Sequence, residues 1–217
     1  MKFGVLGTGP VGTTIASKLI SLGHEVKLGS RSAANEKAID WAVKNGANAS
    51  SGTFEQAASF GEIIFIATLG SGAISALQLA KPENFSGKTV IDISNPLEFS
   101  QGKSPTLFTG LNDSLGERVQ RFLPNADVVK TLNIVNCEVM VNPSLVPGDP
   151  DMFVCGNNSE AKEKVSGLLK DFGWNSIIDL GGIESARVIE PFVLLWVKGW
   201  LHFQTPYFAM KFLKNKD

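Results

Sequence analysis

Short apolar runs alternate with stretches of helical periodicity over the first 135 residues of the chain. The runs typical of strands occupy residues 2–6, 25–28, 47–49, 62–68, 89–93 and 127–132. Helical spacing or helix-start signals lie between them, at residues 11–22, 35–45, from 53 onward, 73–80 and 112–122. Strands that alternate with helices favour a parallel sheet covered by helices on both faces. We therefore predict an α/β fold with a doubly wound parallel sheet, that is, a Rossmann fold.

The pattern changes after about residue 135. Turn-forming residues fill positions 143–150, and a strand at 152–155, an amphipathic helix at 160–172 and a strand at 175–178 follow. Residues 98–110, in the first part, show no clear period, and we expect a long loop there that is functional or mobile. We divide the chain into a Rossmann domain at residues 1–135 and a small C-terminal α/β domain at residues 136–217.

The last predicted helix is apolar on nearly every side. Phe192, Trp196, Trp200 and Phe203 form one stripe, and aliphatic side chains cover much of the remaining surface. A helix that is apolar all round is normally buried. A chain of 217 residues can hardly bury it alone, so we expect this helix to lie at a subunit interface and the protein to be a homodimer.

Composition and charge narrow the class of protein. Hydrophobic residues make up 43% of the chain and charged residues 19%, which is ordinary for a globular protein. The net charge of −1 gives no basic surface for nucleic acid. The terminal apolar stretch is too short to span a bilayer. Cys137 and Cys155 lack the spacing of metal ligands, so we expect no metal site. In a fold of this size we expect them to be buried thiols in a reducing compartment, which indicates a cytoplasmic location.

A glycine motif directly follows the first predicted strand and opens the first predicted helix. In such a loop the first glycine permits a tight turn, the second lets the backbone approach a pyrophosphate, and the third lets the helix pack against the sheet. The helix N-terminus favours the negative charge of the pyrophosphate. We predict a dinucleotide site formed by Gly7, Thr8, Gly9, Pro10, Val11 and Gly12.

The end of the second predicted strand indicates which dinucleotide is bound. NAD-binding sites place an acidic residue about 20 residues beyond the glycines, where it contacts the ribose hydroxyls. Here the position holds Ser30 and Arg31, and Lys37 follows in the next helix. A planar guanidinium suits a phosphate better than a neutral diol. We therefore predict that the cofactor is NADP and that Ser30, Arg31 and Lys37 surround its 2′-phosphate.

Two more strand ends are expected at the same edge of the sheet, because ligands bind outside the carboxyl ends of the strands in such folds. Thr68, Leu69 and Gly70 follow one buried strand, and Asn95-Pro96 follows the next. The first group is expected to run beside the cofactor. Pro96 favours an extended Asn95, which could bond near the nicotinamide ribose; a plain turn at Asn95-Pro96 is the alternative.

Four segments together resemble the NADPH oxidoreductases that depend on coenzyme F-420, a deazaflavin. They are Gly7–Gly12 through Gly29-Ser30-Arg31, Val90–Leu97, Val129–Asn136 and Gly182–Pro191. The resemblance implies a homodimer that transfers hydride between NADPH and a deazaflavin, a flavin or a similar acceptor. It also implies that NADP contacts residues 8–12, 30–31, 68–70 and the region of Asn95, with Lys37 as a shifted match.

Hydride transfer to a ring needs contact between two rings and exclusion of water rather than a protein acid, so we name no catalytic residue. Tyr207 and Lys211 spell the YxxxK pattern of short-chain dehydrogenases, but lie too late in the chain for that class. His24 is expected to be structural, and His202 to satisfy a buried hydrogen bond. Residues 98–110 and 133–136 are our candidates for the acceptor side.

Two other functions are consistent with the same glycines. A non-enzymatic NADP-binding module, which senses nucleotide state or regulates a partner, needs no cavity above the nicotinamide. A reductase of small carbonyl or imine substrates needs a proton donor, which the sequence does not supply. The favoured hypothesis is an NADPH-dependent oxidoreductase whose partner is a small, planar redox acceptor.

Overall fold

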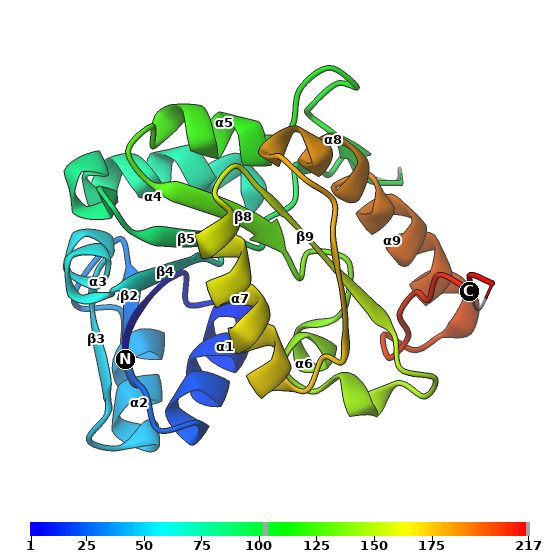
Figure 1. The fold of residues 1–217 in the computed structure, drawn as a ribbon. Helices are drawn as coiled ribbons and strands as arrows, with labels where there is room; N and C mark the ends of the chain where they lie inside the picture. The colour runs from blue at the N-terminus through cyan, green and yellow to red at the C-terminus, as the bar shows by residue number, and fades with distance from the viewer. Residues whose placement is uncertain (102–103, 216–217) are drawn as a thin grey trace.

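The computed structural model describes residues 1–101 and 104–215 as one mixed sheet with helices on both faces (Figure 1). The sheet has eight strands. They are β1 (Lys2–Leu6), β2 (Glu25–Ser30), β3 (Ala49–Thr53), β4 (Ile63–Ile66), β5 (Thr89–Asp92), β8 (Asp127–Thr131), β9 (Asp151–Gly156) and β10 (Ser176–Asp179). A separate hairpin pairs β6 (Leu97–Glu98) with β7 (Thr106–Leu107).

The strand order confirms the predicted doubly wound fold. Six strands run parallel in the order β3-β2-β1-β4-β5-β8, which is the order of a Rossmann sheet with its switch point between β1 and β4. The C-terminal α/β portion continues this sheet: β9 pairs antiparallel with β8, and β10 pairs parallel with β9. The division into two domains at residue 135 stays a prediction.

The helices form two layers. On one face α1, α2, α6 and α7 lie side by side, and on the other face α3, α4 and α5 do so, with α8 beside α5. The helices are α1 (Pro10–Ser21), α2 (Glu36–Asn45), α3 (Phe54–Phe60), α4 (Ala73–Ala80), α5 (Leu115–Phe122), α6 (Cys137–Val141), α7 (Ser159–Phe172), α8 (Ala186–Ile189) and α9 (Phe192–Phe203). Short 3-10 turns η1 (Gly70–Gly72), η2 (Pro82–Phe85), η3 (Pro143–Leu145) and η4 (Ile183–Ser185) join them.

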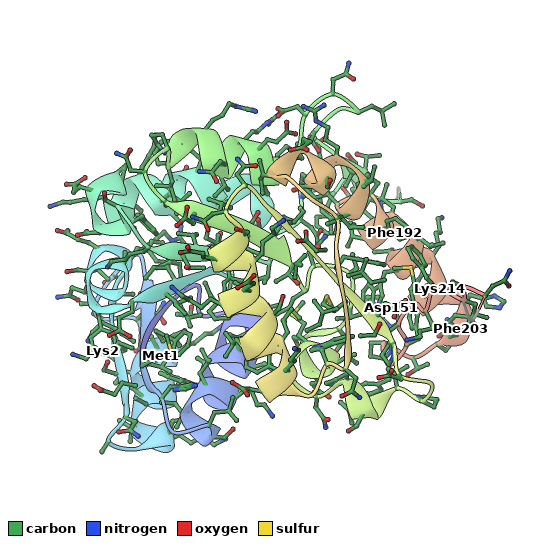
Figure 2. The ribbon with its side chains drawn as sticks, in the orientation of Figure 1. Met1, Lys2, Asp151, Phe192, Phe203 and Lys214 are labelled. Atoms are coloured by element: carbon green, nitrogen blue, oxygen red, sulfur yellow. The ribbon has the colours of Figure 1, made fainter. Side chains whose placement is uncertain are left out.

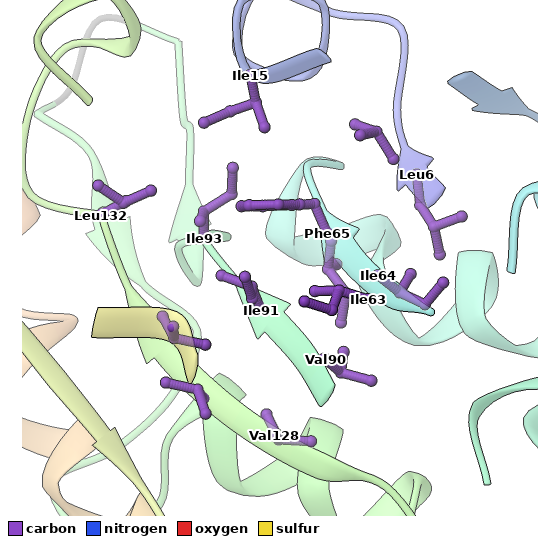
Figure 3. Packing of buried hydrophobic residues seen from close by; sticks show 14 of the residues in the cluster. Leu6, Ile15, Ile63, Ile64, Phe65, Val90, Ile91, Ile93, Val128 and Leu132 are labelled. Atoms are coloured by element: carbon purple, nitrogen blue, oxygen red, sulfur yellow. The ribbon is translucent and has the colours of Figure 1, made fainter. Parts of the chain in front are cut away.

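The core lies between the sheet and each helical layer. Ile63–Ile66 of β4 is buried along its whole length, as expected for a central parallel strand covered on both sides. Phe65, Ile91 and Ile93 lie beside Ile15 of α1 and Leu6 of β1 in this core (Figure 3). Since both faces of the central strands are buried, their carboxyl ends are held at fixed positions.

Three sequence predictions need correction. The third strand is at residues 49–53 rather than 47–49, because Ser50–Thr53 pair with β2 although they are small and polar. The helix expected at 112–122 begins at Leu115, where the Ser114 hydroxyl caps it by accepting from the Glu117 N–H. Residues 98–110 contain strand β7 and part of the hairpin, not only loop; Gly102 and Lys103 lie outside the described residues.

The C-terminal helix α9 lies at the edge of the molecule beside the end of the chain (Figures 1 and 2). Val193 is its one buried residue, while Leu195, Trp200 and Leu201 are exposed. The following segment folds back on the helix, and the Phe208 ring stacks on Trp196 at 5.7 Å between ring centroids.

The expectation for His202 was wrong. Its side chain is exposed on α9 and packs edge-on against Phe203, so it satisfies no buried hydrogen bond. A single chain leaves this side of the helix uncovered, which the apolar pattern alone could not reveal. Within residues 1–101 and 104–215, no helix combines the length and the apolar character that crossing a membrane requires.

The predicted start of α3 at Thr53 gives a test of local stability. The Thr53 hydroxyl accepts from the Gln56 N–H at 3.1 Å, and the Gln56 side chain accepts from the Thr53 N–H at 2.9 Å. We predict that Thr53→Ala lowers the free energy of unfolding by about 1 kcal/mol, because the helix start loses its cap. Urea unfolding measures this loss. Thr53→Ser, which keeps the hydroxyl, is the control, and an equal loss in both variants would contradict the assignment.

Candidate active site

A groove of about 670 Å³ follows the carboxyl ends of β2, β1, β4 and β5, where the fold places a dinucleotide. Its volume is in the usual range for small-molecule sites. The predicted residues that line it are Gly7, Thr8, Gly9, Pro10, Val11, Ser30, Arg31, Thr68, Leu69, Gly70 and Asn95. Four loops that are far apart in the sequence therefore meet at one edge of the sheet, as expected from the strand order.

The glycine loop is shaped to hold a pyrophosphate. Gly7 has a φ of +128°, a backbone angle that residues with a side chain rarely adopt. A Cβ on Gly12 would collide with the carbonyl oxygen of Gly7. A Cβ on Gly9 would meet no described protein atom within 4 Å, so the backbone there faces open space. Gly9 is the N-cap of α1 and no side chain caps this helix. The free end of α1 therefore offers backbone N–H groups to an anion, which fits the pyrophosphate.

The end of β2 forms the second part of the groove. The Ser30 hydroxyl donates to the Ser32 carbonyl at 2.5 Å and so orders the turn after the strand. Arg31 is exposed at the groove wall, and Asn35 also lines the groove. An exposed guanidinium next to an ordered turn can pair with a phosphate in a bidentate way. Lys37 lies exposed in the first turn of α2 and is not among the lining residues.

Several groove residues escaped the sequence analysis. Phe54 begins α3, and Ala76 and Leu79 belong to α4; all three line the groove and add apolar surface to it. Phe54 directly follows the predicted cap Thr53, so the start of that helix at the ligand edge was the available signal. Nothing in the sequence indicated Ala76 and Leu79, which look like ordinary helix residues.

The other end of the groove lies at β4 and β5. The Asn95 side chain donates to the Asn133 carbonyl at 2.8 Å, and the Asn133 side chain donates back to Asn95 Oδ1 at 2.8 Å. A Cβ on Gly70 would collide with the carbonyl oxygen of Asn95, so the two loops touch. The Thr68 hydroxyl lines the groove and has no partner among the described residues. A bound ribose or amide would give this hydroxyl a partner.

Gly12, Pro96 and Lys37 are the predicted site residues that do not line the groove. Gly12 acts through packing, as its contact with Gly7 shows. Pro96 follows Asn95, whose side chain is fixed by Asn133. The role assigned to each predicted cofactor-binding residue stays a prediction.

The other candidate groups lie away from the groove. Tyr207 donates to Glu138 at 2.5 Å, and Lys211 pairs with Asp151 at 2.9 Å, so the YxxxK residues hold separate partners. His24 packs on Phe3 and has the structural place expected of it. Burial raises the pKa of the Cys155 thiol to about 12, which makes it unreactive.

Comparison with known proteins identifies the family. A family model described as NADP oxidoreductase, coenzyme F420-dependent, matches residues 2–96. The F420-dependent NADP reductase of Methanocaldococcus jannaschii is 31% identical over 199 residues, with 88% of each chain covered. The chain belongs to the family of F420-dependent NADP reductases. It is therefore an NADP-dependent oxidoreductase, not the non-enzymatic module that the residues alone left open.

Two further proteins are similar to this chain. The crystal structure of an Arthrobacter sp. FB24 protein is 40% identical to this chain, and the match covers 99% of this chain and 100% of that one, with a TM-score of 0.94. Metalloreductase STEAP3 of Rattus norvegicus is 29% identical over 201 residues. The match covers 92% of this chain but only 38% of STEAP3.

The exposed Arg31 gives a test of the 2′-phosphate site. We predict that Arg31→Ala weakens the binding of NADPH by about 10- to 100-fold, because a hydrogen-bonded charge pair with the phosphate is lost. Binding of NADH, which lacks this phosphate, should change little. Fluorescence titration measures both affinities. Arg121→Ala is the control, since Arg121 is also exposed but pairs with Asp113; an equal loss for NADPH and NADH would contradict the assignment.

Proposed function

We propose that this protein transfers hydride between NADPH and a planar redox cofactor of the deazaflavin or flavin type. The main support for this proposal is the set of side chains that line the groove at the ends of β4 and β5. Leu69, Ile93, Leu97 and Phe99 line it together with the hydroxyl of Thr68 and the carboxamide of Asn95. Leu69 and Phe99 are large and exposed at 78% and 70%, so they offer apolar surface to a second ring.

The roles of the chain's own residues follow from their places along the groove. Arg31 and the α1 N-terminus bind the phosphates, and the recess at Phe54 holds the adenine. Asn95 and Thr68 orient the nicotinamide half, and Leu69 and Phe99 exclude water from the rings. NADPH supplies the hydride when it is bound.

The neutral lining favours a ring acceptor over a carbonyl. Reduction of a carbonyl or imine requires a proton at the oxygen or nitrogen beside the carbon that accepts hydride. In a deazaflavin or flavin the balancing proton adds to a ring nitrogen and can come from water. Hydroxyl, carboxamide, aliphatic and aromatic groups line this end of the groove. This lining suits hydride transfer to a deazaflavin or flavin ring. The family name supports a deazaflavin as the first acceptor to test.

We predict that the protein oxidises NADPH in the presence of a deazaflavin or a flavin, and not with small ketones or cyclic imines. Absorbance of NADPH measures turnover. With NADPH deuterated at C4, the label should appear on the ring carbon of the reduced deazaflavin, because hydride passes directly between the rings. Turnover with a ketone or imine but with no ring acceptor would contradict the proposal.

We also propose that α9 joins two copies of the chain into a homodimer, in the cytoplasm. Four large apolar side chains of α9 are left exposed by one chain: Leu195, Trp200, Leu201 and Phe203. Exposed apolar surface of this kind is typical of protein–protein contacts. The resemblance to dimeric oxidoreductases points to a second copy as the occupant.

We predict that the wild-type chain sediments as a dimer and that Leu201→Glu shifts it to a monomer, because a charge at the centre of an apolar contact is desolvated without a partner. Sedimentation velocity measures the mass. Val43→Glu, at an exposed position on α2, is the control and should leave the dimer intact. A monomeric wild-type chain at micromolar concentration would contradict the dimer.

A further inference from the structure

A lysine is buried completely in the middle of the sheet, behind the groove. Lys130 of β8 and Asp92 of β5 are fully buried, and Glu190, at the end of α8, is 1% exposed. Asp92 and Lys130 face each other in the register of the two strands. Charged side chains are seldom buried unless they are paired, so this cluster has a specific arrangement.

The Lys130 ammonium contacts three oxygen atoms. It donates to Asp92 Oδ2 at 2.9 Å and to the backbone carbonyl of Ser94, and it forms an ion pair with Glu190 Oε1 at 3.1 Å. Burial opposes the charged form, but the two carboxylates outweigh it and hold the pKa of Lys130 above its usual value. The ammonium therefore stays charged and bonded.

One of these acceptors belongs to the groove wall. Ser94 and Asn95 line the groove beyond β5. The Ser94 carbonyl accepts from Lys130, while its N–H and hydroxyl donate to Asp92 Oδ1 at 3.0 and 2.5 Å. All three polar groups of Ser94 are thus bound to the cluster. The next residue, Asn95, is fixed on its other side by Asn133.

The Glu190 carboxylate connects the cluster to the helical layer that contains α5 and α8. Glu190 accepts from the N–H groups of Leu115 and Gly116, each at 2.9 Å, at the start of α5. These bonds fix the Glu190 carboxylate and, through Lys130, the Ser94 carbonyl. Strand β8, the loop after β5 and the end of α8 are therefore joined through the Lys130 side chain.

We propose that Lys130 is a positioning residue that holds Ser94 and Asn95 in the geometry that binds the nicotinamide half of NADP. The proposal rests on the assignment of the Asn95 end of the groove to the nicotinamide. It does not depend on the identity of the acceptor. Lys130 acts through Ser94, since its own side chain lies behind the groove wall.

We predict that Lys130→Met weakens the binding of NADP+ by about 10-fold, because affinity falls in proportion to the fraction of molecules in which Ser94 and Asn95 keep the binding geometry, here reduced to about one tenth. Binding of adenosine 2′,5′-bisphosphate, which lacks the nicotinamide half, should change less than twofold. Calorimetry measures both affinities without an acceptor. Lys162→Met is the matched control, because this variant also loses a lysine ion pair, with Asp179, which does not line the groove. Its ratio of NADP+ affinity to adenosine 2′,5′-bisphosphate affinity should equal that of the wild type.

A lysine that only stabilises the fold would change both affinities together or neither. An unchanged ratio in folded Lys130→Met, as judged by circular dichroism, overturns the proposal. If this variant does not fold, the triple variant Lys130→Met, Asp92→Asn, Glu190→Gln replaces it, because buried ion clusters tolerate neutral substitution when no charge is left unpaired. The same ratio decides, measured against the double variant Asp92→Asn, Glu190→Gln, which differs from the triple variant only at Lys130: a selective loss of NADP+ affinity relative to that double variant supports the proposal, and an unchanged ratio overturns it.

Discussion

The buried positive charge of Lys130 is the constraint on which much of this structure depends. A charged ammonium inside a protein is costly unless every proton finds an acceptor. Here the acceptors come from β5, from the loop after it and from α8, which lie 36 to 60 residues away from Lys130 in the sequence. Meeting that requirement therefore ties Glu190, and with it the end of α8, to the Rossmann sheet, in addition to the pairing of β9 with β8.

Three segments that carry the family resemblance each contribute one member of this cluster. Asp92 lies in the segment 90–97, Lys130 in 129–136 and Glu190 in 182–191. The segments are thus related by contact and not only by order along the chain. The first also supplies Asn95 and the second supplies Asn133; at the end of the groove the Asn95 side chain donates to the Asn133 backbone carbonyl and accepts from the Asn133 side chain. Packing behind the site and chemistry within it are linked by the same short stretches.

Features that depend on a few neighbouring residues could be predicted from the sequence, whereas contacts between distant segments could not. The loop at Gly7–Gly12 and the exposed Arg31 follow from backbone and phosphate chemistry over a few residues, and the structure places both at the groove. The reversal of β9 against β8 and the Lys130–Glu190 pair depend on residues far apart. Periodicity predicts that α9 is apolar, but not which side is covered, so His202 was placed wrongly.

The position of α9 follows from the same buried cluster. The helix begins at Phe192, two residues after Glu190, and Pro191 between them restricts the backbone at its start. Because Glu190 is paired with Lys130 and accepts from the N-terminus of α5, the residue just before α9 is anchored to the buried cluster. Its exposed apolar side chains are therefore carried by a helix whose first turn adjoins an anchored residue. A flexible connection at this point would leave the same residues without a defined partner surface.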